Sequence, residues 1–167
     1  GSTNVYPKGA LVLQMLKKYL GEERFWAGVR RYLKDHALDV AVTDDLRQAF
    51  LAATGENLDW FWEQWIYQAG YPEFTVQAAW DSAAASLVLH VEQTQVDSAS
   101  PDSTGLKYVT PAVFRMPVTV RVGTPTGDAT SRTWLTGRRQ EITVPGVTAA
   151  PAMVIFDASN AILKRLT

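Results

Sequence analysis

The chain has 167 residues, of which 47% are hydrophobic and 20% are charged, and its formal net charge is -1. These proportions are typical of a globular protein and exclude a disordered, collagen-like or coiled-coil chain. The near balance of acidic and basic residues argues against a dedicated nucleic-acid binder. Cysteine is absent, which excludes disulfide frameworks, cysteine zinc sites and cysteine nucleophiles.

No apolar run approaches the ~20 residues of a membrane helix, so no membrane segment is expected. Gly1 and Ser2 resemble the scar left by removal of a purification tag, and no initiator Met precedes them. We therefore expect the native start to be missing, and the sequence predicts no cellular location.

The first part of the chain, from Tyr6 to Gly70, has the period of amphipathic helices. Gly21 and Gly55, together with the expected N-caps Thr43 and Asn57, separate four predicted helices, the last of which stops at Gly70. The predicted apolar stripes, in chain order, are Val12, Met15, Leu16, Tyr19 and Leu20; Phe25, Val29, Tyr32, Leu33 and His36; Leu46, Ala49, Phe50 and Ala53; and Leu58, Phe61, Trp62, Trp65, Ile66 and Ala69.

After Pro72 the pattern changes to short alternating strands separated by turn-forming clusters. Strands are predicted within 74–78, 87–91, 118–122, 133–135, 141–144 and 153–156, and turns at 98–105, 123–127, 137–138 and 145–146. Short strands at this spacing favour an antiparallel β-sandwich over βαβ units. The predicted fold class is α+β, with an α-helical domain over 1–72 and a β-sandwich over 73–167.

Most of the usual catalytic sets are missing. His36 and His90 lie on different predicted elements, and neither has a second histidine at i+3 or i+4, so both are predicted to be structural. Neither an H-E-x-x-H zinc motif nor a G-x-S-x-G elbow occurs. Adjacent carboxylates at the starts of the second and third helices fit a helix-dipole role.

Tryptophan is concentrated in the fourth predicted helix, at Trp60, Trp62 and Trp65. A stripe at helical spacing indicates core packing, but Trp60 falls outside it. We therefore expect other structure, including structure absent from this chain, to surround this helix.

A series of short motifs follows in order along the first part of the chain. They are Val5-Tyr6-Pro7-Lys8-Gly9-Ala10, Leu20-Gly21-Glu22-Glu23-Arg24-Phe25, Thr43-Asp44-Asp45-Leu46, Gly55, Leu58-Asp59-Trp60-Phe61 with Trp65, and Gly70-Tyr71-Pro72. Over about residues 5–75 their order and spacing resemble the zinc aminopeptidases of the gluzincin class, the relatives of membrane alanyl aminopeptidase and leukotriene hydrolase. The β-rich remainder is similar to the sandwich domain that follows the catalytic domain in that family.

The resemblance implies that the parent protein removes N-terminal residues from peptides by zinc-assisted attack of water. Tyr6 matches the family's Tyr that stabilises the oxyanion of the tetrahedral intermediate, a role that suits a phenol aimed at developing negative charge. The structural alternative is that Tyr6 packs at a helix start. No substrate-binding residues are predicted.

In the family, the zinc ligands and the general base lie upstream of the segment that this chain matches. The resemblance therefore implies a C-terminal fragment without metal ligands, which should bind no stoichiometric zinc and hydrolyse nothing alone. Its expected partners are the missing catalytic half or a second copy of itself, because helices that packed on the missing half would expose apolar surface. We expect a dimer, a domain swap or marginal solubility.

Two alternatives remain open. The chain could be a non-catalytic protein-interaction module built from the Trp-rich helices and the β-sandwich, which a degenerate H-E-x-x-H upstream would favour. It could also be an unrelated helical domain, in which case Tyr6→Phe in the full-length protein would leave peptide cleavage unchanged.

Overall fold

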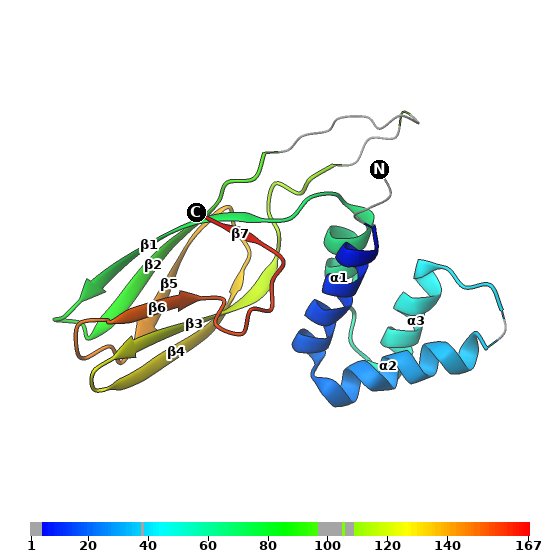
Figure 1. Ribbon diagram of the computed structural model, residues 1–167, viewed down its shortest axis with the longest axis horizontal. Coiled ribbons are helices and arrows are strands. Elements are labelled where there is room, and N and C mark those ends of the chain that lie inside the picture. Colours follow the sequence, from blue (N-terminus) through cyan, green and yellow to red (C-terminus); the bar gives the residue numbers. More distant parts are fainter. Residues whose placement is uncertain (1–4, 38, 97–104, 106–108) are drawn as a thin grey trace. The chain divides into compact units, whose positions relative to one another are not determined.

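The computed structural model describes residues 5–37, 39–96, 105 and 109–167, with the backbone alone at 5–7. The chain divides into two compact units, Gly1–Tyr67 and Gln68–Thr167, the first helical and the second built of strands (Figure 1). Among the described residues, every helix is too short or too polar to cross a bilayer.

The helical unit contains four α-helices, and the last of them continues into a π-helical turn. The elements are α1 (Val5–Leu20), α2 (Glu22–Asp35), α3 (Thr43–Thr54), α4 (Asp59–Trp62) and the π-turn η1 (Glu63–Tyr67). The prediction of four helical segments is thus confirmed, with Gly21 at the start of α2 and Gly55 at the end of α3. The buried apolar side chains of this unit are Val12, Met15, Leu16, Leu20, Phe25, Ala49, Phe50, Leu58, Phe61, Trp62 and Trp65.

Helices α2 and α3 approach closely at Gly28. A Cβ atom at this position would lie 2.5 Å from Cδ1 of Phe50, so the contact requires glycine. The prediction that Leu33 faces the core is wrong, because its side chain is 62% exposed. Gly28 occupies the buried position, and a glycine carries no apolar signal in the sequence.

The caps of α3 and α4 are shifted by one residue from their predicted positions. The N-cap of α3 is Val42 and not Thr43, and its N–H donates a 2.8 Å hydrogen bond to Oδ2 of Asp45. Asn57 lies one residue before the N-cap of α4, yet its Oδ1 accepts a hydrogen bond from the N–H of Asp59. The side chains of Asp45 and Asn57 thus accept hydrogen bonds from backbone amides that the start of a helix would otherwise leave unpaired.

The fourth helix was predicted as one continuous α-helix, and this is wrong after Trp62. The π-helical turn η1 has more residues per turn than an α-helix, so the buried stripe changes its register. Gln64 and Trp65 become buried, whereas Ile66 is 37% exposed. The polar residue Gln64 therefore takes a place that the α-helical period assigns to an exposed side chain.

The second unit consists of two sheets, with strand orders β5-β2-β1-β7 and β4-β3-β6 (Figure 1). The strands are β1 (Glu73–Asp81), β2 (Ser86–Gln93), β3 (Met116–Thr124), β4 (Gly127–Leu135), β5 (Arg139–Pro145), β6 (Met153–Phe156) and β7 (Arg165–Leu166). All pairs are antiparallel except β1–β7, which is parallel. The predicted α+β class is confirmed, with this one parallel pair as the exception.

Alternating apolar residues form the core of the sandwich. The predicted inward positions of β2 and β3 are all buried: Leu87, Leu89, Val91, Val118, Val120 and Val122. In β1, Phe74 packs against Phe156 with ring centroids 5.2 Å apart. The prediction fails at Ala78, because the second half of β1 is exposed.

Turns predicted from glycine and proline connect the strands. The 123–127 segment joins β3 to β4, where Thr124 pairs with Gly127. The predicted turn at 98–105 lies outside the described residues apart from Gly105.

Two buried polar side chains, Gln93 and Asp157, form hydrogen bonds with the backbone of loops in the sandwich. The buried amide of Gln93 accepts a 2.8 Å hydrogen bond from the N–H of Phe114 and donates to its carbonyl at 2.9 Å. The carboxylate of Asp157, which follows β6, accepts hydrogen bonds from the N–H groups of Ala161 and Ile162. It also forms an ion pair with Lys164.

Candidate functional site

Tyr6, the predicted catalytic residue, lies in the first turn of α1, and its side chain is outside the described part of the structure. Two residues further along the helix, Lys8 is partly buried, and this burial lowers the pKa of its ammonium group below the usual value. The structure therefore places the motif that resembles the family at the N-terminal end of α1.

The opposite end of α1 is held by a polar cluster around Glu56. Tyr19, in the last turn of α1, donates its hydroxyl to Oε1 of Glu56 at 2.5 Å. Arg24, at the start of α2, pairs with Oε2 of the same carboxylate at 2.6 Å. The ring of Trp60 contacts Tyr19 edge-on, with centroids 5.2 Å apart. One carboxylate thus connects α1, α2 and the loop that precedes α4.

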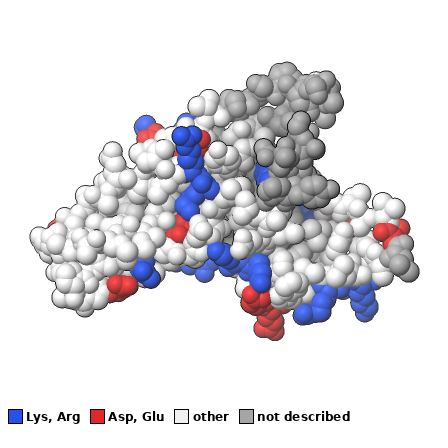
Figure 2. All heavy atoms as spheres, viewed as in Figure 1, with Lys and Arg blue, Asp and Glu red and all other residues white. Residues whose placement is uncertain are grey.

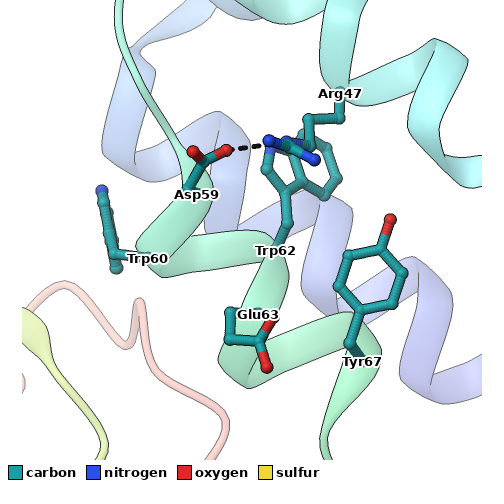
Figure 3. A pocket seen from close by; sticks show the side chains of 6 residues that line it. All are labelled: Arg47, Asp59, Trp60, Trp62, Glu63 and Tyr67. Carbon is teal, nitrogen blue, oxygen red and sulfur yellow. Dashed lines mark hydrogen bonds and ion pairs between the residues drawn. The ribbon is translucent and has the colours of Figure 1, made fainter.

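The helical unit also carries an open pocket of about 410 Å³ beside the π-helical turn. Its lining comes from α3, α4 and η1 and consists of Arg47, Asp59, Trp60, Trp62, Glu63 and Tyr67. Figure 3 shows the Arg47 side chain reaching from α3 to Asp59, with Glu63 and Tyr67 projecting from η1. We call this hollow the Arg47 pocket.

Carboxylates dominate the charge of the Arg47 pocket. Nε of Arg47 lies 2.7 Å from Oδ1 of Asp59, and Nη1 lies 3.0 Å from Oδ1 of Asp44. The hydrogen bond that Arg47 donates to Asp59 raises the pKa of the guanidinium above its usual value. Asp44 is not part of the lining, so the pocket itself holds two carboxylates, Asp59 and Glu63, and one guanidinium.

The floor of the Arg47 pocket includes an unsatisfied polar group. Trp62 is 1% exposed, and its indole Nε1 is buried without a hydrogen-bond partner. A buried donor left unpaired costs about 1–3 kcal/mol, which makes such groups rare. Sequence reasoning assigned Trp62 to the core, which is confirmed, but it did not identify the pocket.

The described residues do not fit a zinc ion. Across the described parts of the chain, no group of three or more His, Asp or Glu side chains is arranged to hold a metal. His36 lies 4.0 Å from Asp45 in the helical unit, and His90 lies 3.0 Å from Glu141 on the exposed face of the sandwich. Neither histidine belongs to a metal-binding cluster of described residues.

Figure 2 shows Lys and Arg side chains in small groups, with fewer Asp and Glu side chains visible from this side. Blue and red side chains lie interspersed among uncharged residues, in keeping with the net charge of -1.

Comparison with known proteins relates these features to a family. Residues 2–65 match the Peptidase family M1 domain. The chain is 33% identical to the puromycin-sensitive aminopeptidase of Caenorhabditis elegans over 143 residues, which cover 85% of this chain and 14% of that protein. It is 37% identical to aminopeptidase N of Lactococcus lactis over 82 residues, covering 49% of this chain and 10% of that protein.

The fold is also similar to part of a solved structure. The crystal structure of Legionella pneumophila aminopeptidase A in complex with aspartic acid matches 96% of this chain with a TM-score of 0.71, at 15% identity and over 17% of its own length. The chain therefore spans a small part of the relatives that it matches. The resemblance of this chain to the zinc aminopeptidases of family M1 is confirmed, and residues 2–65 carry the match to the peptidase domain.

Proposed function

We propose that this chain is part of a zinc-dependent aminopeptidase that hydrolyses N-terminal residues from peptides. The observation that carries the proposal is the match of residues 2–65 to the M1 peptidase domain, a segment that includes Tyr6-Pro7-Lys8-Gly9-Ala10. Residues 1–72 would be the α-helical C-terminal part of the catalytic domain, and residues 73–167 the β-sandwich that follows it.

Within that enzyme, the proposed role of Tyr6 is to donate a hydrogen bond to the oxyanion that forms during attack on the peptide carbonyl. A donor that is already in position when charge develops stabilises the transition state more than the ground state. Removal of one such donor costs about 10²- to 10³-fold in kcat in enzymes that use oxyanion holes. KM should change little, because the interaction is made in the transition state.

The test is Tyr6→Phe in the full-length protein encoded by the source gene, assayed with an aminoacyl chromogenic substrate. Tyr32→Phe is a matched control, because Tyr32 lies on α2 and its ring contacts His36. We expect Tyr6→Phe to lower kcat by about 10²-fold or more with unchanged zinc content, and Tyr32→Phe to retain activity. Equal activity of Tyr6→Phe and the wild type would leave Tyr6 as a packing residue.

The 167-residue chain by itself should be inactive. Its described residues contain no cluster that could hold zinc, and in the proposed enzyme the metal ligands come from other parts of the protein. Zinc content measured by mass spectrometry and peptidase assays on the tag-free chain test this. Stoichiometric zinc or measurable turnover would contradict it.

The proposed partner of the isolated chain is the missing part of the peptidase domain or, in its absence, a second copy. Several large apolar side chains of the helical unit are more than a third exposed, which supports this: Leu11, Leu13, Trp26, Leu33, Val40, Val42, Leu51 and Ile66. Light scattering of the purified chain should show association. A monodisperse monomer that binds no hydrophobic dye would contradict the proposal.

The alternative function is a non-catalytic interaction module. The observation that favours an interaction module is the Arg47 pocket, an open pocket lined by three aromatic and three charged side chains. The two functions make different predictions for the source gene. An intact upstream H-E-x-x-H with a later helical Glu supports the peptidase, whereas a motif without its His or Glu supports the module.

A further inference from the structure

Helix α1 connects two places that matter for the proposed reaction. Tyr6 lies in its first turn, and the cluster of Tyr19, Arg24 and Glu56 lies at its other end. The first buried apolar side chain among the described residues of α1 is Val12, and the others follow it toward the C-terminal end. Among the described side chains of the helical unit, the buried contacts of α1 therefore lie from Val12 onward, in the part of the helix that is away from Tyr6.

We propose that Glu56 is a positioning residue for catalysis, which orients α1 through Tyr19 and thereby places Tyr6 against the substrate. The proposal rests on the proposed role of Tyr6. Glu56 does not act on the substrate itself, because its contacts are to the opposite end of the helix.

The geometry of Glu56 suits this task. Its two oxygens are used by different helices: Oε1 accepts from the hydroxyl of Tyr19 in α1, and Oε2 accepts from the guanidinium of Arg24 in α2. Its side chain is 27% exposed, so the bonds are partly shielded from water. Charge-assisted hydrogen bonds of this kind are short and directional, and they fix an orientation that apolar packing alone leaves adjustable.

A small rotation of α1 has a large effect at its first turn. At 1.5 Å per residue, Tyr6 and Tyr19 are about 20 Å apart along the axis. A tilt of about 3° about the anchored end would displace Tyr6 by about 1 Å, and such a displacement can cost about 10²-fold in rate. Because the core of α1 limits the tilt, we expect a smaller effect, about tenfold in kcat for Glu56→Ala and about threefold for Glu56→Gln.

The experiment is a double-mutant cycle in the full-length enzyme with Tyr6→Phe and Glu56→Ala. If Glu56 acts through Tyr6, its substitution lowers kcat in the wild type but has little further effect once the Tyr6 hydroxyl is gone. KM and zinc content should stay unchanged. Tyr19→Phe, which deletes one hydroxyl and keeps the ring, should reproduce the loss in kcat and serves where Glu56→Ala folds poorly.

The matched control is Glu22→Gln, which breaks a second contact between the same two helices. Glu22 pairs with Lys17 at 2.8 Å but is 72% exposed, so its substitution should leave kcat unchanged. Wild-type kcat in both Glu56→Ala and Tyr19→Phe would overturn the proposal, as would losses that multiply with that of Tyr6→Phe. If Tyr6→Phe itself is fully active, the proposed role of Tyr6 fails first, and the inference about Glu56 fails with it.

Discussion

The loop after β6 depends on one buried carboxylate, and we predict that Asp157→Asn strongly destabilises the sandwich. The side chain of Asp157 is 1% exposed, and it accepts hydrogen bonds from the N–H groups of Ala161 at 2.9 Å and Ile162 at 3.1 Å. It also pairs with Lys164 at 2.7 Å, whose side chain is 13% exposed. Asparagine has nearly the same shape and tolerates the positive φ of 57° at this position, so the substitution tests charge and hydrogen bonding without added backbone strain.

The magnitude follows from the partners that remain. Breaking a buried ion pair from one side costs about 3–5 kcal/mol, because the other charge stays buried without compensation. Lys164 can move partly into water, which reduces the loss, whereas the new NH₂ group faces a backbone N–H, which adds to it. We expect a decrease of about 3 kcal/mol in the free energy of unfolding of the sandwich. For a unit of this size, this corresponds to a Tm lower by about 15 °C.

Urea denaturation of the 167-residue chain measures this value, and amide hydrogen exchange at Ala161 and Ile162 assigns the loss to the loop. Asp128→Asn is the matched control, because Asp128 pairs with Arg121 at 3.6 Å on an exposed edge and should change stability by less than about 0.5 kcal/mol. A loss below about 1 kcal/mol in Asp157→Asn, or equal losses in the two variants, would refute the reasoning.

Four further substitutions test the packing and electrostatics of the chain. Gly28→Ala should destabilise the helical unit by about 2 kcal/mol in thermal denaturation, since the added methyl collides with Phe50, whereas Gly9→Ala meets no atom within 4 Å and should stabilise α1 by about 0.5–1 kcal/mol. Replacing Gln93 by Leu should cost the sandwich about 2 kcal/mol in urea denaturation, because it leaves a buried backbone amide unpaired; a change below about 0.5 kcal/mol would contradict this. Lys8→Met should raise the Tm near pH 7, and this gain should shrink as pH rises toward 10.5. The folded-state pKa of Lys8 lies below its unfolded value, so the cost of burying its charge falls to zero as pH rises from the folded-state pKa to the unfolded one. A gain in Tm that does not change with pH would contradict the assignment.

The sequence predicts the helices and strands well where apolar periodicity is a local property. Leu16 and Phe50 in the helices and Leu89 and Val120 in the strands are all buried as expected, because each lies on a stripe that only one face of its element can display. The two-residue strand β7 was not predicted, since two residues are too few to show alternation.

The π-helical turn could not be predicted, because an α-turn and a π-turn differ by one hydrogen-bond register and the local sequence carries no signal for either. The Arg47 pocket depends on a contact between Arg47 and Asp59, which are twelve residues apart and lie on different helices. Nothing in the local sequence indicates that these side chains meet. The role of Tyr6 came from the resemblance, and it stays a prediction.

The parallel pairing of β7 with the beginning of β1 affects how the sandwich would respond to mechanical force. The backbone N–H of Arg165 donates to the carbonyl of Pro72, and that of Thr167 donates to the carbonyl of Phe74. If the chain is pulled from both ends of this unit, these two strands are drawn along each other in opposite directions. The hydrogen bonds between them are then loaded together in shear and do not open one after another. The two-residue strand β7, at the edge of the sheet, would thus give the whole unit its resistance to mechanical unfolding.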